Sequence, residues 1–113
     1  MKPYTDKRPW GEERCLTQNG QSTVKLFYVK AGESLSLQVH HHRDEFWKVL
    51  SGNPETIVGD MSYKNKVGDE IFIPQDSQHR ISAPTDDVII LEISTGDFDE
   101  KDEIRLDDKY NRL

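Results

Sequence analysis

Short runs of alternating apolar and polar residues follow one another from residue 23 to residue 94. Turn-forming residues separate the runs, which cover 23–29, 34–40, 45–50, 55–59, 70–74, 79–84 and 87–94. A period of two residues is typical of β-strands with one buried face. Several such strands at regular spacing predict an all-β sandwich or barrel.

The two ends of the chain differ from this middle part. Residues 1–14 are polar and contain two prolines, so we expect an extended N-terminal arm. Residues 97–113 form an acidic C-terminal segment, with seven acidic and two basic residues between Asp97 and Asp108. Its best helix candidate is a short one within 99–104. With 113 residues in total, we expect a single domain over 1–113.

The composition narrows the choice of partners. A net charge of −6 makes the chain a poor ligand for nucleic acid backbones. No run approaches the roughly 18 apolar residues that a membrane span needs, and mean hydropathy is −0.81. The single cysteine, Cys15, excludes an internal disulfide and fits a reducing compartment. The N-terminus has no apolar stretch typical of a secretory signal, so we expect a cytoplasmic protein.

Strand alternation gathers a set of metal-binding side chains. Gln38 and His40 are two residues apart and share one strand face, whereas His41 points the other way. Glu45 lies on the next run and His79 on a later one, so the three faces can meet if the sheet closes on itself. Two imidazoles, a carboxylate and an amide oxygen suit a divalent metal such as Zn, Co, Mn, Ni or Fe. The sequence therefore predicts Gln38, His40, Glu45 and His79 as metal ligands.

Two blocks of the chain carry the spacing of the cupin motifs. The first, G-x5-Q-x-H-x4-E-x6-G, spans residues 32–52, and the second, G-x5-P-x-D-x2-H, spans 68–79. The pattern resembles the two cupin motifs, with Gln38 where the first histidine usually stands. Asp76 replaces the usual glycine of the second motif, and Ala83 its usual asparagine. The resemblance implies a single-domain cupin, a double-stranded β-helix (jelly-roll) barrel with the metal inside.

The flanking residues carry a narrower resemblance over almost the whole chain. It rests on RPWG at 8–11, LSLQ-x-HHHR-x-E-x-W at 35–47, IP-x4-HR at 73–80 and LEIS-x-G at 91–96. The chain resembles the C-terminal isomerase domain of type II mannose-6-phosphate isomerases, often fused to mannose-1-phosphate guanylyltransferase. Phe46 stands where that family usually has a histidine, and alternation turns it away from Glu45.

The resemblance implies an activity and roles for several residues. The activity is interconversion of mannose 6-phosphate and fructose 6-phosphate through an enediol(ate), in sugar-nucleotide and polysaccharide precursor metabolism. Glu92 is the candidate base for proton transfer, and Arg43 is a second catalytic candidate beside the ligands. The candidates for substrate binding are Arg80, Lys48, Arg105 and Trp47. Small cupins are commonly dimers, so the resemblance also implies a homodimer.

Two other functions fit the same residues. His40, Glu45 and His79 alone form the two-histidine, one-carboxylate set of non-haem iron oxygenases, although Gln38 takes a position that dioxygen would need. A non-catalytic sugar-binding or regulatory cupin is the other alternative. The 113 residues hold no glycine-rich nucleotide loop, so we expect no guanylyltransferase activity from them.

Overall fold

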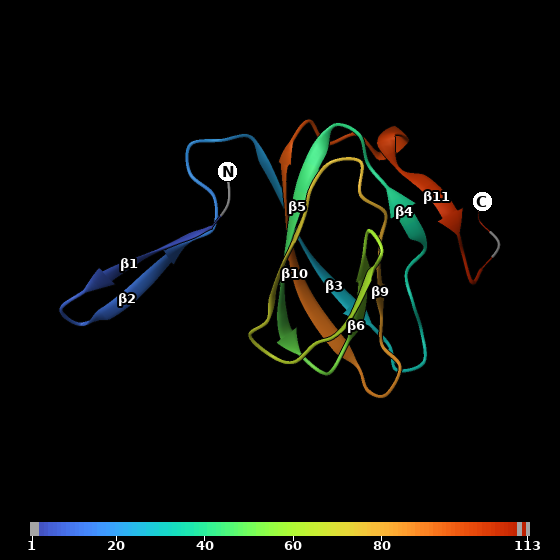
Figure 1. Ribbon diagram of the computed structural model, residues 1–113, viewed down its shortest axis with the longest axis horizontal. Coiled ribbons are helices and arrows are strands. Elements are labelled where there is room, and N and C mark those ends of the chain that lie inside the picture. The colour runs from blue at the N-terminus through green and yellow to red at the C-terminus, as the bar shows by residue number, and fades with distance from the viewer. Residues whose placement is uncertain (1–2, 111, 113) are drawn as a thin grey trace.

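The computed structural model describes residues 3–110 and 112, and it is built almost entirely of β-strands (Figure 1). The strands are β1 (Tyr4–Arg8), β2 (Gly11–Cys15), β3 (Ser22–Val29), β4 (Leu37–Val39), β5 (Arg43–Ser51), β6 (Glu55–Val58), β7 (Met61–Lys64), β8 (Glu70–Ile73), β9 (His79–Ser82), β10 (Val88–Gly96) and β11 (Ile104–Asp107). A single 3-10 turn, η1 (Glu100–Asp102), is the only helical element in this described part. The predicted all-β fold is confirmed.

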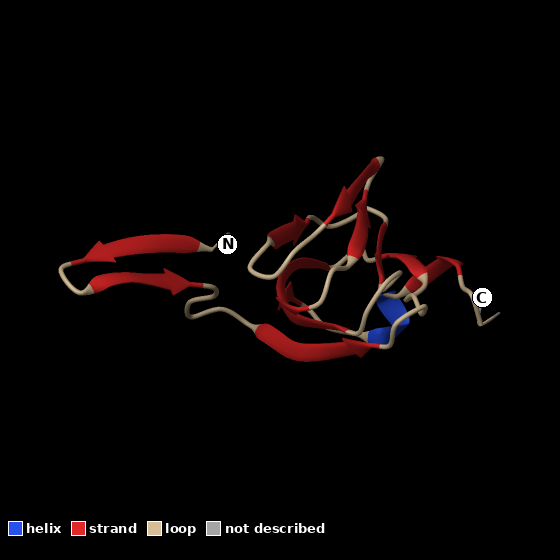
Figure 2. Cartoon of the chain, turned by 90° about the horizontal axis from the view of Figure 1, so that it is seen from below, coloured by secondary structure: helices blue, strands red, loops and turns tan. Residues whose placement is uncertain are grey.

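Two antiparallel sheets form the body of the molecule. One has the strand order β3-β10-β5-β8, and the other has the order β11-β4-β9-β6-β7. Figure 2 shows these strands curving around a common interior, while the β1-β2 hairpin projects to one side. Neighbours within the sheets are distant in sequence, since β4 pairs with β9 and β10 pairs with β3 and β5. This order is that of a jelly roll.

The inward faces of β5 and β10 change character along their length. Toward one end Val49 lies opposite Ile90, and both are almost completely buried. Toward the other end Glu45 lies opposite Ser94, and these are buried as well. The apolar end is completed by a cluster of Val29, Trp47, Val49, Ile71, Ile73, Ile81, Ala83, Val88 and Ile90. Burial of each large side chain in it contributes about 1.5–3 kcal/mol, so this end stabilises a barrel whose other end is polar.

One turn at the apolar end requires glycine. Gly52 has φ +85°, a left-handed conformation that side chains disfavour. A Cβ added there would lie 2.2 Å from the carbonyl oxygen of Asp87 and 2.9 Å from Val88 Cγ2. The chain after β5 therefore passes directly against the start of β10, which leaves no room for a side chain.

The two ends of the chain are more ordered than the sequence predicted. Instead of an extended arm over 1–14, β1 and β2 form a hairpin in which Tyr4 pairs with Cys15 and Arg8 with Gly11. Arg14 links the hairpin to the barrel through an ion pair with Glu70. Residues 1–2 lie outside the described part.

The acidic C-terminal segment returns to the barrel. β11 pairs with β4, and η1 occupies the position of the predicted short helix within 99–104. Asp102, at the end of η1, is 9% exposed, and its carboxylate accepts hydrogen bonds from the backbone N–H groups of His41 and His42. The segment is therefore attached to the loop that follows β4. Within the described residues, no helix has the length and apolar character needed to cross a membrane.

Candidate metal centre

Three candidate ligands converge at the polar end of the barrel. His40 follows β4 directly, Glu45 belongs to β5, and His79 begins β9. Their ligand atoms lie within 4.8 Å of one another, and each residue is at most 4% exposed. Glu45 Oε1 is 2.9 Å from His40 Nε2 and 3.6 Å from His79 Nε2. The structure thus brings together three of the four predicted ligands from segments up to 39 residues apart (79 − 40).

Hydrogen bonding around these residues is incomplete in a way that a cation would satisfy. His79 Nδ1 lies 2.9 Å from the carbonyl oxygen of Ser77, to which it can donate, so Nε2 faces Glu45 with its lone pair. Among the described residues, the buried side-chain atoms without a partner in hydrogen-bonding geometry are His40 Nδ1, Glu45 Oε1 and Arg43 Nε, the last two of which lie 3.5 Å apart. Unpaired buried polar atoms are costly. Two imidazoles and one carboxylate are a donor set that fits a divalent metal ion.

Gln38 lies beside these three residues. It is directly opposite His79 in the β4-β9 register, and its side chain lines the same cavity. Its Nε2 donates to Ser36 Oγ at 2.8 Å, which directs one end of the amide away from the ligands. The amide oxygen remains as a donor for a metal, and its role as fourth ligand stays a prediction.

A second buried carboxyl group adjoins Glu45. Trp47 Nε1 donates to Glu92 Oε2 at 3.1 Å and to Glu45 Oε2 at 3.3 Å, and Ser94 Oγ donates to Glu92 Oε1 at 3.4 Å. Burial, together with a hydrogen bond and repulsion from Glu45, raises the pKa of Glu92 to about 9. Burial also acts to raise the pKa of Glu45, but the adjacent His40 imidazole and a hydrogen bond from Glu92 hold this pKa well below its usual range. One carboxyl is therefore protonated and the other ionised.

The histidine side of the site favours neutral imidazole. Burial lowers the pKa of His79, and the carboxylate of Glu45 only partly opposes this effect. A metal ligand must offer an unprotonated nitrogen. Burial therefore favours the unprotonated imidazole of His79, the form that a metal ligand needs.

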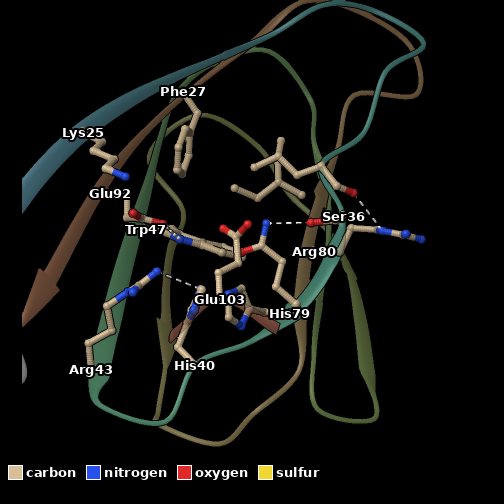
Figure 3. A pocket seen from close by; sticks show the side chains of 13 residues that line it. Lys25, Phe27, Ser36, His40, Arg43, Trp47, His79, Arg80, Glu92 and Glu103 are labelled. Atoms are coloured by element: carbon tan, nitrogen blue, oxygen red, sulfur yellow. Dashed lines mark hydrogen bonds between the residues drawn. The ribbon is translucent and has the colours of Figure 1, made fainter. Parts of the chain in front are cut away.

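A cavity of about 110 Å³ opens beside the ligands (Figure 3). It is lined by Lys25, Phe27, Leu35, Ser36, Gln38, His40, Arg43, Trp47, His79, Arg80, Ile81, Glu92 and Glu103. The lining includes the predicted catalytic residues Glu92 and Arg43, and one face of the cavity is formed by Trp47. Acidic, basic and aromatic groups thus face one space next to the candidate metal site.

Arg43 is held firmly in place. It is 4% exposed, its Nη2 lies 3.1 Å from His40 Nε2, and its Nη1 donates to the carbonyl oxygen of Asp99 at 3.3 Å. Its Nε is 3.5 Å from Glu45 Oε1. Arg43 therefore adds fixed positive charge beside Glu45, and its catalytic role stays a prediction.

The predicted phosphate-binding residues have different positions. Arg80 lines the cavity, but its guanidinium already donates to the Leu35 carbonyl at 3.0 Å and to Asp107 at 2.8 Å. The structure does not bring Lys48 to the cavity, because alternation puts it on the outer face of β5, 3.6 Å from Glu70. Arg105 borders a neighbouring cavity.

Other residues of the lining were not among the predicted site residues. Lys25 and Glu103 both face the cavity. Lys25 has the same parity on β3 as the inward-facing Phe27 and Val29, so the alternation of residues 23–29 held a usable signal. Glu103 has no such signal, since its place depends on how the C-terminal segment folds back.

Phe46, the departure from the family pattern, lies away from the metal ligands. It pairs with Phe72 of β8 on the outer face of the sheet and is not part of the cavity lining. Its position agrees with the alternation read from the sequence.

The barrel and its buried ligand set define a cupin, and comparison with known structures supports this class. A capsular polysaccharide assembling protein, CapF from Staphylococcus aureus, aligns with a TM-score of 0.70 over 94% of this chain and 34% of its own, at 17% identity. A cupin protein from Bacteroides fragilis aligns with a TM-score of 0.62 over 72% of this chain and 70% of its own, at 24% identity. These likenesses show the fold.

The chain belongs to the family described as mannose-6-phosphate isomerase C-terminal, whose model matches residues 3–108. A mannose-1-phosphate guanylyltransferase 2 of Escherichia coli O157:H7 is 37% identical over 105 residues, covering 91% of this chain and 22% of its own length. The alginate biosynthesis protein AlgA of Pseudomonas aeruginosa is 37% identical over 107 residues, covering 93% of this chain and 22% of its own length. This chain therefore spans about a fifth of these relatives, which are enzymes of sugar-phosphate metabolism.

These relatives correct one prediction. The sequence predicted interconversion of mannose 6-phosphate and fructose 6-phosphate, but the similar proteins are named as mannose-1-phosphate guanylyltransferases and as polysaccharide biosynthesis proteins. That prediction is wrong as a statement of this chain's function. The resemblance correctly gave the family, but a family description does not fix which reaction a member performs.

Proposed function

We propose that this domain binds a divalent metal ion through His40, Glu45 and His79, with Gln38 as fourth ligand, and holds a sugar phosphate in the adjoining cavity. The observation that carries the proposal is the convergence of three buried ligands whose atoms lie within 4.8 Å, two of them with unpaired polar atoms. The relatives support a sugar phosphate as the ligand, since mannose 1-phosphate appears in their names.

The cavity also favours acid–base chemistry on that ligand. A bound divalent ion supplies a Lewis acid that polarises sugar oxygens. Glu92 lines the cavity, and burial beside Glu45 raises its pKa, so its carboxyl can donate a proton to a ligand in the cavity. The indole N–H of Trp47 holds the Glu92 carboxyl in one orientation. We therefore propose that the domain is an enzyme of sugar-phosphate metabolism in which Glu92 donates a proton to the bound ligand.

Metal content and ligand binding test the proposal together. The chain is purified, stripped with a chelator and reloaded with Zn, Co or Mn, and calorimetry follows binding of mannose 1-phosphate and mannose 6-phosphate. We expect binding that needs the metal. In His79→Ala the metal affinity falls by about 100-fold or more, because loss of a ligand exceeds the 10–100-fold cost of losing a neighbour of a ligand.

His41→Ala is the matched control. It also removes one imidazole, but His41 is exposed and its Nδ1 lies 2.5 Å from Asp76 rather than among the ligands. We expect its metal content to equal that of the wild type. Equal metal content in His79→Ala, or sugar-phosphate binding that is the same with and without metal, would contradict the proposal.

A further inference from the structure

A second cavity adjoins the metal-site cavity and is basic. It is lined by Lys25, Arg43, Phe98, Glu103 and Arg105. Lys25, Arg43 and Glu103 line both cavities, so the two spaces share a wall. Figure 3 shows Lys25 and Arg43 on the same side of the metal-site cavity as Glu92. The two spaces are therefore adjacent.

An aromatic ring holds two of the cations in position. Lys25 Nζ lies 4.2 Å from the centroid of the Phe98 ring, and Arg43 Cζ lies 4.5 Å from it. Cations over an aromatic face are attracted by its quadrupole. Phe98 comes from the C-terminal segment, whereas Lys25 belongs to β3 and Arg43 to β5. Three separate parts of the chain thus build this basic corner.

Protein carboxylates balance only part of the positive charge of the second cavity. Glu103 is the one carboxylate among the residues lining it, and it lies 2.9 Å from Arg105 Nη2. Among the described side chains, Lys25 Nζ forms no ion pair, although the residue is half-buried. Arg43 also lies 3.5 Å from Glu45 Oε1, so Lys25 is the one cation of these three without a paired carboxylate among the described residues, and a net charge of about +1 remains. A phosphate monoester carries close to two negative charges at neutral pH.

We infer that this second cavity is the phosphate subsite, in which Lys25 and Arg105 bind the phosphate group while the sugar occupies the metal-site cavity. The inference rests on the proposed function for the identity of the ligand. Arg43 lies at the shared wall and adds positive charge from the side of the metal ligands. Charge-assisted hydrogen bonds from fixed cations are the strong contacts by which proteins bind phosphate.

The test compares two lysines of the same sheet. Lys25→Gln removes a charge at the subsite, and Lys48→Gln removes one on the outer face of β5, where Lys48 lies 3.6 Å from Glu70. Calorimetry on the metal-loaded proteins measures binding of mannose 6-phosphate, mannose 1-phosphate and inorganic phosphate. We expect Lys25→Gln to weaken all three by about tenfold, as loss of a charged hydrogen bond does. Lys25→Arg retains most of the affinity, and Lys48→Gln equals the wild type.

Metal content, measured in every variant, separates a local effect from loss of the fold. Wild-type affinity in metal-loaded Lys25→Gln overturns the subsite, as does an equal loss in Lys48→Gln. If sugar phosphate binding needs the metal but does not change in the Lys25 variants, the subsite is overturned and the proposed function stands. If the wild type binds inorganic phosphate through Lys25 but neither sugar phosphate, the subsite stands and the proposed function fails. If no phosphate compound binds, both fail.

Discussion

Glu45 and Glu92 are neighbouring buried carboxyl groups that the barrel holds in different protonation states. Glu45 faces two imidazoles and Arg43, so negative charge is favoured there. Glu92 is buried beside the ionised Glu45, to which it can donate a hydrogen bond, so a proton is favoured there, although the hydrogen bond that it accepts from Trp47 opposes this. The two roles that we propose, metal ligand and proton donor, follow from this difference in surroundings.

This difference predicts how the metal-free protein responds to pH. The folded pKa of Glu92 is raised to about 9 against an ordinary value of 4.5, so in this range the unfolded chain releases a proton that the folded chain keeps. The free energy of unfolding therefore falls as pH rises, by at most about 1.4 kcal/mol per pH unit from this group. Urea unfolding in chelator between pH 7 and 8.5, above the ordinary titration of histidine, measures the slope.

Glu92→Gln is the variant that isolates the effect. Its amide keeps a donor toward Glu45 and an acceptor for Trp47 but cannot lose a proton. We expect its stability to change less with pH than that of the wild type over the same range. Parallel slopes in the two proteins would show that the Glu92 carboxyl is ionised in the fold.

At the scale of elements, the sequence predicted strands where one face is buried and missed those exposed on both faces. Residues 23–29 and 87–94 correspond closely to β3 and β10, which bury alternate side chains. β7 and β11 are exposed along their whole length, so they have no alternation to detect. The hairpin was missed for a similar reason, since its residues are largely exposed.

The same distinction explains which parts of the site could be predicted. Alternation and motif spacing separated His40 from His41, and in the structure His40 lies among the candidate ligands whereas His41 lies beside Asp76. The local sequence does not predict that Glu103 lines the cavity or that Arg80 pairs with Asp107. Both contacts depend on the pairing of the C-terminal segment with β4. The long-range contacts of a segment without apolar–polar alternation cannot be predicted from its sequence alone.

The turn at Gly52 supplies a test of this element packing. Gly52→Ala places a Cβ 2.2 Å from the Asp87 carbonyl oxygen, at φ +85°. Gly59→Ala is the control, with φ +60° but no atom within 4 Å of the added carbon. The backbone penalty of about 1–2 kcal/mol is common to both, while the overlap costs Gly52→Ala about 1–3 kcal/mol more. Chemical denaturation of the two variants measures the difference, and equal stability would mean that the turn opens freely.

At the scale of the whole molecule, stability and chemistry occupy opposite ends of one barrel. The apolar cluster surrounds Val49 and Ile90, and the candidate ligands surround Glu45 four residues away along the same strand. A polar site of this kind is expensive to bury. The apolar end offsets that cost and keeps the ligand-bearing strands rigid.

The outer face of β3 is a candidate contact surface for the predicted homodimer. Val24, Leu26 and Tyr28 alternate along this edge strand and are 58%, 48% and 70% exposed. The homodimer stays a prediction. Light scattering of the purified chain gives its mass in solution, and a monomer at all concentrations would contradict it.

We predict that the projecting β1-β2 hairpin is not needed for binding of metal or sugar phosphate. β1 and β2 pair with each other, Arg14 contacts Glu70 of the barrel, and no described residue of the hairpin lines either proposed binding cavity. A variant that begins at Thr17 should therefore keep its metal content and bind sugar phosphate within about twofold. Its stability should fall by about 1 kcal/mol or less, the range for a partly exposed ion pair. Arg14→Ala in the full chain, measured in parallel, gives the contribution of that ion pair alone. If the truncated chain loses its metal but Arg14→Ala does not, the prediction is wrong and the hairpin stabilises the polar end of the barrel.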